Sequence, residues 1–186
     1  MTKKIIVAIS GASGAIFGVK ALEILREIGV ETHLVLSKPA YQTIMTETDL
    51  SIKEVKSLAD YVYDNADIGA ICASGTFKSD GMIIAPTSMK TLGEIANGMC
   101  GTLIARTADV MLKERRPLVL LPREMPLNLV HIRNMETITL MGGIISLPVP
   151  AFYTKPTTIE EMVYQIVARN LELFDLKIPT IQRWKQ

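Results

Sequence analysis

The sequence contains few of the residues that mark several large classes of protein. Only two of its 186 residues are cysteines, Cys72 and Cys100, and they match no metal-binding or redox spacing. Aromatic residues make up 5% of the chain, and the formal net charge is +1. A disulfide framework and a cysteine-based metal site are therefore disfavoured. Partners bound through bulk charge, such as nucleic acid or an anionic membrane, are not expected.

Long hydrophobic runs are also missing. The apolar run 5–9 follows Lys3 and Lys4, but it is shorter than the apolar core of a signal peptide. No segment provides the roughly 20 apolar residues that a membrane-spanning helix needs. We therefore expect a cytoplasmic protein without a membrane segment, in which both cysteines are reduced.

Aliphatic residues dominate what is present, and they recur in two alternating patterns. Continuous apolar runs predict buried parallel strands, and apolar residues at helical spacing predict helices between them. The predicted strands are 4–9, 31–36, 82–85, 118–121 and 144–147. The predicted helices are 14–27, 39–46, 52–59, 92–97, 103–113, 127–141 and 159–173. This alternation predicts a single α/β domain over residues 1–186, doubly wound around a mostly parallel, Rossmann- or flavodoxin-like sheet, with a tail at 178–186.

Small and polar residues follow the predicted strands 4–9, 31–36 and 82–85. Ligands of open parallel sheets bind beyond the carboxyl ends of the strands, and free N–H groups at helix starts attract anions. The glycine spacing fits neither a dinucleotide fingerprint nor a phosphate-binding P-loop, and each hydroxyl alone could simply cap a helix. Two such polar turns on neighbouring strand ends favour a ligand site. The candidates are Gly11, Ala12, Ser13, Ser37, Ser88, Met89, Lys90 and Thr91.

The stretch from Lys113 to Glu124 carries the strongest chemical signal. The predicted strand 118–121 ends in Pro122, Arg123 and Glu124, which places a guanidinium and a carboxylate where a ligand would bind. Together they could bind an anion and move a proton. The cations before the strand could instead form a solvated helix face.

These segments together resemble the flavin prenyltransferase family, which includes UbiX and relatives associated with phenolic acid decarboxylases. The resemblance covers nearly the whole chain and includes the segments 11–15, 47–49, 88–91, 106–110, 112–126, 151–153 and 167–169. Its most specific part is the stretch Leu-Lys-Glu-x-Arg-x-Leu-Val-Leu-x-Pro-Arg-Glu at 112–124. The resemblance implies transfer of a dimethylallyl group from dimethylallyl phosphate to N5 and C6 of reduced FMN, without a metal. It also implies a homo-oligomer, typically a dodecamer, whose product serves a UbiD-type decarboxylase.

The resemblance also implies roles for individual residues. FMN would be bound by the strand-end candidates named above and by Arg106 and Arg123. The prenyl phosphate would be bound by Lys113, Arg123, Glu124, Tyr153, Arg169 and Trp184. Ser13, Lys113 and Glu124 would be catalytic. In this scheme Glu124 acts as an acid toward the phosphate, Ser13 relays a proton near N5, and Trp184 offers an aromatic face to the allyl group.

Two alternatives remain at this point. An FMN-dependent cysteine decarboxylase would share the architecture and a flavin loop like 86–91, but the segment 17–25 lacks the histidine that such enzymes use, and 126–128 lacks their methionine. A passive FMN carrier would need fewer cations than surround Arg123 and Glu124.

Overall fold

Six parallel strands form one sheet in a computed structural model that describes residues 2–184. The strands are β1 (Lys4–Ile9), β2 (Glu31–Leu36), β3 (Tyr61–Asp64), β4 (Gly81–Thr87), β5 (Leu118–Pro122) and β6 (Ile144–Ile145). Their order is β3-β2-β1-β4-β5-β6, so the chain winds outward in both directions from the adjacent pair β1 and β4. Sheets of this kind form a crevice at the carboxyl ends of such a pair.

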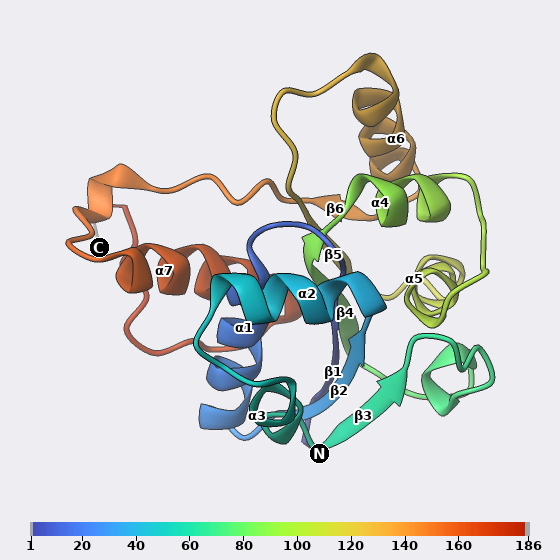
Figure 1. The fold of residues 1–186 in the computed structure, drawn as a ribbon, viewed down its shortest axis with the longest axis horizontal. Helices are drawn as coiled ribbons and strands as arrows, with labels where there is room; N and C mark the ends of the chain where they lie inside the picture. Colours follow the sequence, from blue (N-terminus) through green and yellow to red (C-terminus); the bar gives the residue numbers. More distant parts are fainter. Residues whose placement is uncertain (1, 185–186) are drawn as a thin grey trace.

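Helices cover both faces of the sheet, as Figure 1 shows. One face carries α1 (Ala15–Glu27), α2 (Lys38–Glu47), α3 (Ile52–Ser57) and α7 (Ile159–Leu171). The other face carries α4 (Met89–Ala96), α5 (Leu103–Lys113) and α6 (Leu129–Leu140). Three short 3-10 turns complete the chain: η1 (Ile71–Ala73), η2 (Phe152–Thr154) and η3 (Glu172–Phe174). Alternate residues of β1 enter the two cores, with Val7 in one and Ala8 in the other. The predicted doubly wound sheet is confirmed.

Two glycines let helices approach the sheet edge closely. A methyl group at Gly18 would overlap the carbonyl oxygen of Ala85, so α1 can pack on β4 only because residue 18 has no side chain. A methyl group at Gly11 would overlap Pro39 at the start of α2. These contacts fix the position of the loop after β1.

The structure corrects several predicted element bounds. Strand β3 was not predicted, and it lies at the edge of the sheet with Tyr61 and Val62 exposed. Helix α4 begins at Met89 rather than at residue 92, because the Ser88 hydroxyl accepts a hydrogen bond from the Thr91 N–H and caps it. The last strand is limited to Ile144–Ile145.

None of the helices within residues 2–184 combines the length and apolar character needed to cross a membrane.

His33 is a buried titratable group on β2, away from the strand ends. It is 3% exposed, and its Nε2 atom lies 2.9 Å from Glu31 Oε1. Its Nδ1 atom lies 2.9 Å from Tyr63 Oη, and its ring stacks on Tyr61 with 4.8 Å between ring centroids. Burial lowers the pKa of His33, and the neighbouring Glu31 carboxylate offsets only part of that effect. The fold therefore favours the neutral imidazole over the charged one.

We expect the protein to lose stability as the pH falls below 6.5, the ordinary pKa of histidine. In that range the unfolded chain binds a proton that folded His33 does not, so the free energy of unfolding decreases. His33→Phe keeps an aromatic ring in the stack and removes the titration. Melting temperatures between about pH 7.5 and about pH 5 should fall more steeply for the wild type than for the variant. Equal slopes would contradict this assignment.

Candidate functional site

A cavity of about 650 Å³ lies at the carboxyl edge of the sheet, beside the junction of β1 and β4. Its volume is in the range of pockets that hold cofactors. The loops after the first five strands contribute to its wall. The lining residues include Gly11, Ala12, Ser13, Ser37, Lys38, Asn65, Ser88, Met89, Lys90, Thr91, Thr102, Arg123 and Glu124.

Three helices begin at this cavity. Ser37 caps α2 by accepting the Ala40 N–H at 3.2 Å, and Ser88 caps α4 by accepting the Thr91 N–H at 3.2 Å. Thr102 caps α5 in the same way. Helix N-termini carry partial positive charge, so their convergence favours an anionic ligand such as a phosphate. The serine hydroxyls therefore do cap helices, as the sequence allowed, and the helix starts that they cap form part of the cavity wall.

The N-terminus of α1 differs from these three because a carboxylate already covers it. Glu47 Oε2 accepts hydrogen bonds from the N–H groups of Gly14 at 2.8 Å and Ala15 at 3.1 Å. Gly14 has φ of 100°, a conformation that suits glycine. A phosphate at this helix end would meet the negative charge of Glu47. The anion-binding end of the cavity is therefore the side of α2, α4 and α5.

Asn65 joins the end of β3 to the start of α5. Its Oδ1 atom accepts the Ile104 N–H at 3.0 Å, and its backbone oxygen accepts the Leu103 N–H at 2.8 Å. No role was predicted from the sequence for Asn65, Thr102, Lys38 or Glu47. The available signal was the polar turn after the unpredicted strand β3.

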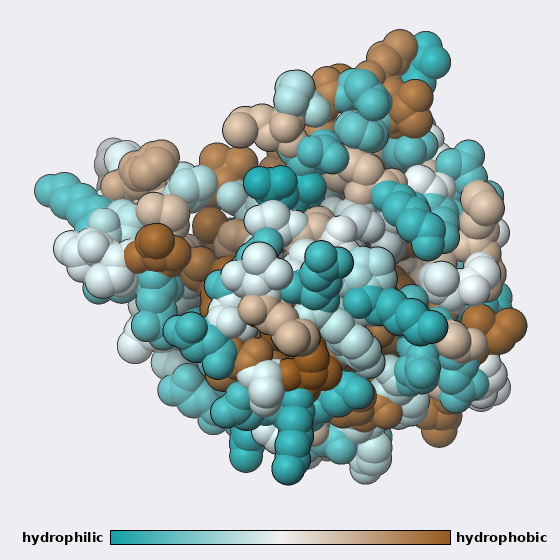
Figure 2. All heavy atoms as spheres, viewed as in Figure 1, coloured by the Kyte–Doolittle hydropathy of each residue, from teal (hydrophilic) through white to brown (hydrophobic). Residues whose placement is uncertain are grey.

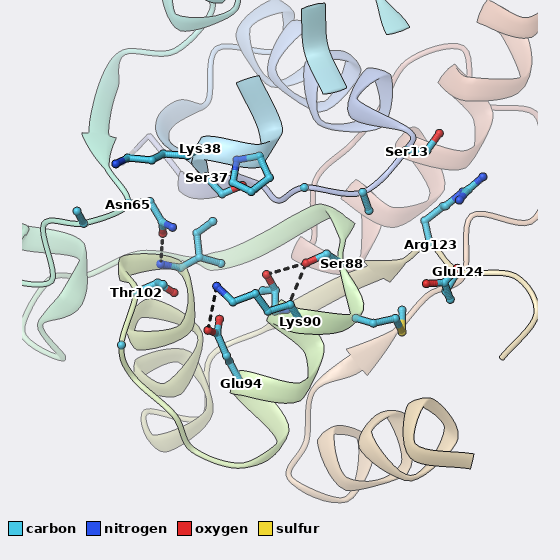
Figure 3. Close-up of a pocket in the computed structure, with 18 of the residues that line it drawn as sticks. Ser13, Ser37, Lys38, Asn65, Ser88, Lys90, Glu94, Thr102, Arg123 and Glu124 are labelled. Carbon is cyan, nitrogen blue, oxygen red and sulfur yellow. Dashed lines mark hydrogen bonds and ion pairs between the residues drawn. The ribbon is translucent and has the colours of Figure 1, made fainter. Parts of the chain in front are cut away.

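The opposite end of the cavity contains Ser13, Arg123 and Glu124. Figure 3 shows these three side chains at one end and Lys38, Asn65 and Thr102 at the other. Arg123 follows β5 directly, and its N–H donates to the Thr87 oxygen at 3.2 Å. The cavity therefore has an anion-binding end and an end lined by a hydroxyl, a guanidinium and a carboxylate.

A second cavity, of about 480 Å³, contains three of the residues predicted to bind the prenyl phosphate. Tyr153, Arg169 and Trp184 line it, together with parts of α7 and of the segment after β6. The Tyr153 and Trp184 rings meet edge to face, with 5.1 Å between centroids. The structure thus places the predicted site residues of one chain in two separate cavities.

Lys113 and Arg106 line neither cavity. Lys113 is the last residue of α5, roughly 16 Å along the helix from the end that meets the first cavity. Its Nζ atom lies 2.7 Å from Glu114 Oε1, and this contact lowers the pKa of the Glu114 carboxyl. Arg106 pairs with Asp109 at 2.8 Å on the same helix. Within one copy of the chain, the structure does not bring these two cations to the predicted flavin site.

Metal-ligating side chains do not gather anywhere in residues 2–184: no group of three or more histidine, cysteine, aspartate or glutamate residues could hold an ion. One end of the first cavity instead offers hydroxyls, three helix starts and the side chains of Lys38 and Lys90, of which Lys90 lies 3.4 Å from Glu94. The phosphate of a ligand such as FMN could be held there by Ser37, Ser88 and Thr91.

The fold and this cavity define a flavoprotein, and residues 1–171 match the model of the Flavoprotein family. Flavin prenyltransferase UbiX of Neisseria meningitidis is 51% identical, over 100% of this chain and 98% of its own. A crystal structure of AnUbiX in complex with FMN and dimethylallyl pyrophosphate is 52% identical, with a TM-score of 0.98 over 100% of this chain and 99% of its own. The chain belongs to the UbiX family of flavin prenyltransferases.

A further solved structure bears on assembly. It is a dodecameric FMN-dependent UbiX-like decarboxylase from Escherichia coli O157:H7, 48% identical, with a TM-score of 0.96 over 98% of this chain and 100% of its own. The family prediction made from the stretch 112–124 is therefore confirmed, and the cysteine decarboxylase alternative is not favoured.

Proposed function

We propose that this protein transfers the dimethylallyl group of dimethylallyl phosphate to N5 and C6 of reduced FMN, using no metal ion. The observation that carries the proposal is the division of the 650 Å³ cavity into an anion-binding end and a reactive end, in a chain half identical to UbiX. Reduced FMN supplies the nucleophilic nitrogen and ring carbon. The protein supplies orientation, positive charge and proton transfer.

The cavity gives FMN one favoured direction. Its phosphate would lie at the starts of α2, α4 and α5, near Ser37, Ser88 and Lys90, because Glu47 already occupies the start of α1. The flavin ring would then extend toward Ser13 and Arg123. In this direction the reacting nitrogen would lie beside Ser13 and Glu124, the side chains proposed to move protons.

The reaction separates charge, and cationic side chains can stabilise that separation. As the carbon–oxygen bond of the prenyl phosphate breaks, the phosphate leaves with the electron pair, and Arg123 and Arg169 can offset its charge. Glu124 can deliver a proton to the departing phosphate, and Ser13 can relay the proton lost at N5. Tyr153 and Trp184 can face the allyl cation with aromatic rings.

We further propose that the complete site forms where copies of the chain meet. Arg123 and Glu124 lie in one cavity, Tyr153 and Arg169 in another, and Lys113 in neither, while a relative of 48% identity is dodecameric. Large apolar side chains are exposed on the outer part of the molecule, where Figure 2 shows brown spheres around α6. Those on α6 and the loop before it are Met125, Leu129, Val130 and Leu140, and the segment between β6 and α7 adds Val149 and Phe152. Exposed apolar clusters of this kind favour contacts between proteins.

The partners follow from this reaction. The prenyl donor is proposed to be the monophosphate, and the recipient of the product is proposed to be a UbiD-type decarboxylase. The location is proposed to be the cytoplasm, as expected from the sequence. These assignments remain predictions.

We expect the purified protein to prenylate reduced FMN when it is incubated anaerobically with dimethylallyl phosphate. The mass of the extracted flavin should increase by one isoprenyl unit, and no carbon dioxide should form from a cysteinyl peptide. Oxidised FMN is the matched control, because its N5 atom is not nucleophilic. Flavin that is bound but unchanged under reducing conditions would favour the carrier alternative.

A further inference from the structure

Residues 178–184, which we call the C-terminal strap, run back along α7. The Tyr164 hydroxyl donates to the Pro179 oxygen at 2.6 Å, and the Gln182 N–H donates to Gln165 Oε1 at 3.2 Å. Ile178 is buried at the root of the strap. The strap is thus fastened to the helix at several points along its length.

The strap also forms one wall of the 480 Å³ cavity. Ile181, Arg183 and Trp184 of the strap line this cavity opposite Arg169 of α7. Trp184 packs edge to face against Tyr153, which belongs to the segment after β6. A ligand held by Arg169 and Tyr153 would therefore be enclosed by the strap, and the position of the strap would affect how tightly it binds.

Glu172 contacts both the C-terminal strap and Arg169, the arginine proposed to bind the prenyl phosphate. Its Oε1 atom accepts a hydrogen bond from Arg183 of the strap, and its Oε2 atom lies 3.8 Å from Arg169 Nη1. The Glu172 side chain is 19% exposed, whereas those of Arg169 and Arg183 are 66% and 48% exposed. The carboxylate is thus the least exposed member of the group, and each of its oxygens is directed at a different guanidinium.

We propose that Glu172 is a positioning residue for the prenyl donor: it holds the C-terminal strap closed through Arg183 and orients Arg169 toward the phosphate. The proposal rests on the proposed function, in which Arg169 binds that phosphate. Glu172 itself does not touch the reacting atoms.

The charges explain how this arrangement would operate. Two guanidiniums and one carboxylate leave a net positive charge, so the cavity still attracts a phosphate. The contact of Arg169 with Glu172 is the longer one, so Arg169 can turn to the phosphate while Glu172 keeps Arg183. Without the carboxylate the two arginines would repel each other, and the strap would lose its ionic contact with η3.

The effect of Glu172 can be measured with a double-mutant cycle on the FMN-loaded protein. Glu172→Gln and Arg183→Gln should each raise the KM for dimethylallyl phosphate about fivefold, the upper range for a partly exposed ion pair, with kcat changed by less than about twofold. The double variant should show the same rise as Glu172→Gln alone, about fivefold, because Arg183 acts through the Glu172 carboxylate that this variant already lacks. Glu160→Gln, on the first turn of α7 and paired with Lys20, is the matched control and should leave KM unchanged.

Trp184 provides a second readout, because it is the only tryptophan of the chain. Its fluorescence in FMN-loaded protein without donor should change in Glu172→Gln and in Arg183→Gln, but not in Glu160→Gln. Wild-type FMN content in each variant verifies folding. A KM unchanged in both single variants, or a rise of about 25-fold in the double variant, would overturn the proposal.

The two proposals fail in distinguishable ways. If the wild type transfers no prenyl group, the proposed function fails, and the Trp184 fluorescence still tests whether Glu172 fastens the strap. If the wild type is active and the variants match it in KM and fluorescence, only the role of Glu172 is lost.

Discussion

Replacement of Glu124 with glutamine is expected to lower the rate of prenyl transfer by about 100-fold or more, which is the usual contribution of a positioned general acid. Glutamine has nearly the same shape but cannot give a proton to the leaving phosphate. FMN should still bind, because the phosphate end of the cavity, around Ser37 and Ser88, is untouched. The loss should therefore appear in kcat rather than in flavin content.

The measurement is a single-turnover assay under anaerobic conditions with FMN already bound and reduced. Glu27→Gln is the matched control, since Glu27 is an exposed carboxylate at the end of α1 that lines neither cavity. A Glu124→Gln variant with the wild-type rate would remove Glu124 from the proton transfer. The charge of Arg123 would then have to stabilise the departing phosphate without an acid.

The fold could be predicted where burial leaves a clear pattern in the sequence. β1 and β5 are buried over almost their entire length, and their continuous apolar runs were recognised with nearly the observed bounds. β3 has the burial pattern of an edge strand, with Tyr61, Val62 and Asp64 exposed, so it has no apolar run to detect. Only its pairing with β2 makes it a strand, and that pairing is a tertiary contact.

The candidate site was predictable to the extent that it follows strand ends. Ser88 and Arg123 come directly after buried strands and Ser13 lies in the loop after β1, and the parallel sheet brings these loops to one cavity. Asn65 was missed because its place depends on the unpredicted strand β3. Glu47 was missed because no local pattern indicates that the end of α2 meets the start of α1.

Lys113 illustrates a different limit. It stands five residues before β5 in the sequence, and the resemblance places it with Glu124 in one site. Lys113 is the last residue of α5, and this helix starts at the first cavity. The helix therefore carries Lys113 roughly 16 Å away from that cavity, toward the amino ends of the strands. The resemblance and the observed position agree if Lys113 of one copy lies at the cavity of another copy. A sequence alone cannot reveal such an arrangement.

Co-assembly of two inactive variants, Lys113→Ala and Glu124→Gln, is therefore expected to restore activity. A site formed between copies needs Glu124 from one chain and Lys113 from its neighbour. In oligomers mixed at equal amounts, about a quarter of such sites combine two intact residues, so activity should return to about a quarter of the wild-type value. Each variant assembled alone should stay near zero.

The control for this experiment is the pair Arg123→Ala and Glu124→Gln. Arg123 and Glu124 line the same cavity of one chain, so every site in that mixture keeps one defect and no activity should return. Co-expression with two affinity tags, followed by sequential purification, isolates the mixed oligomers. Recovery in the Lys113 mixture alone would place that lysine in a neighbouring copy's site. Absence of recovery in both mixtures would contradict the placement of Lys113 in the site of a neighbouring copy.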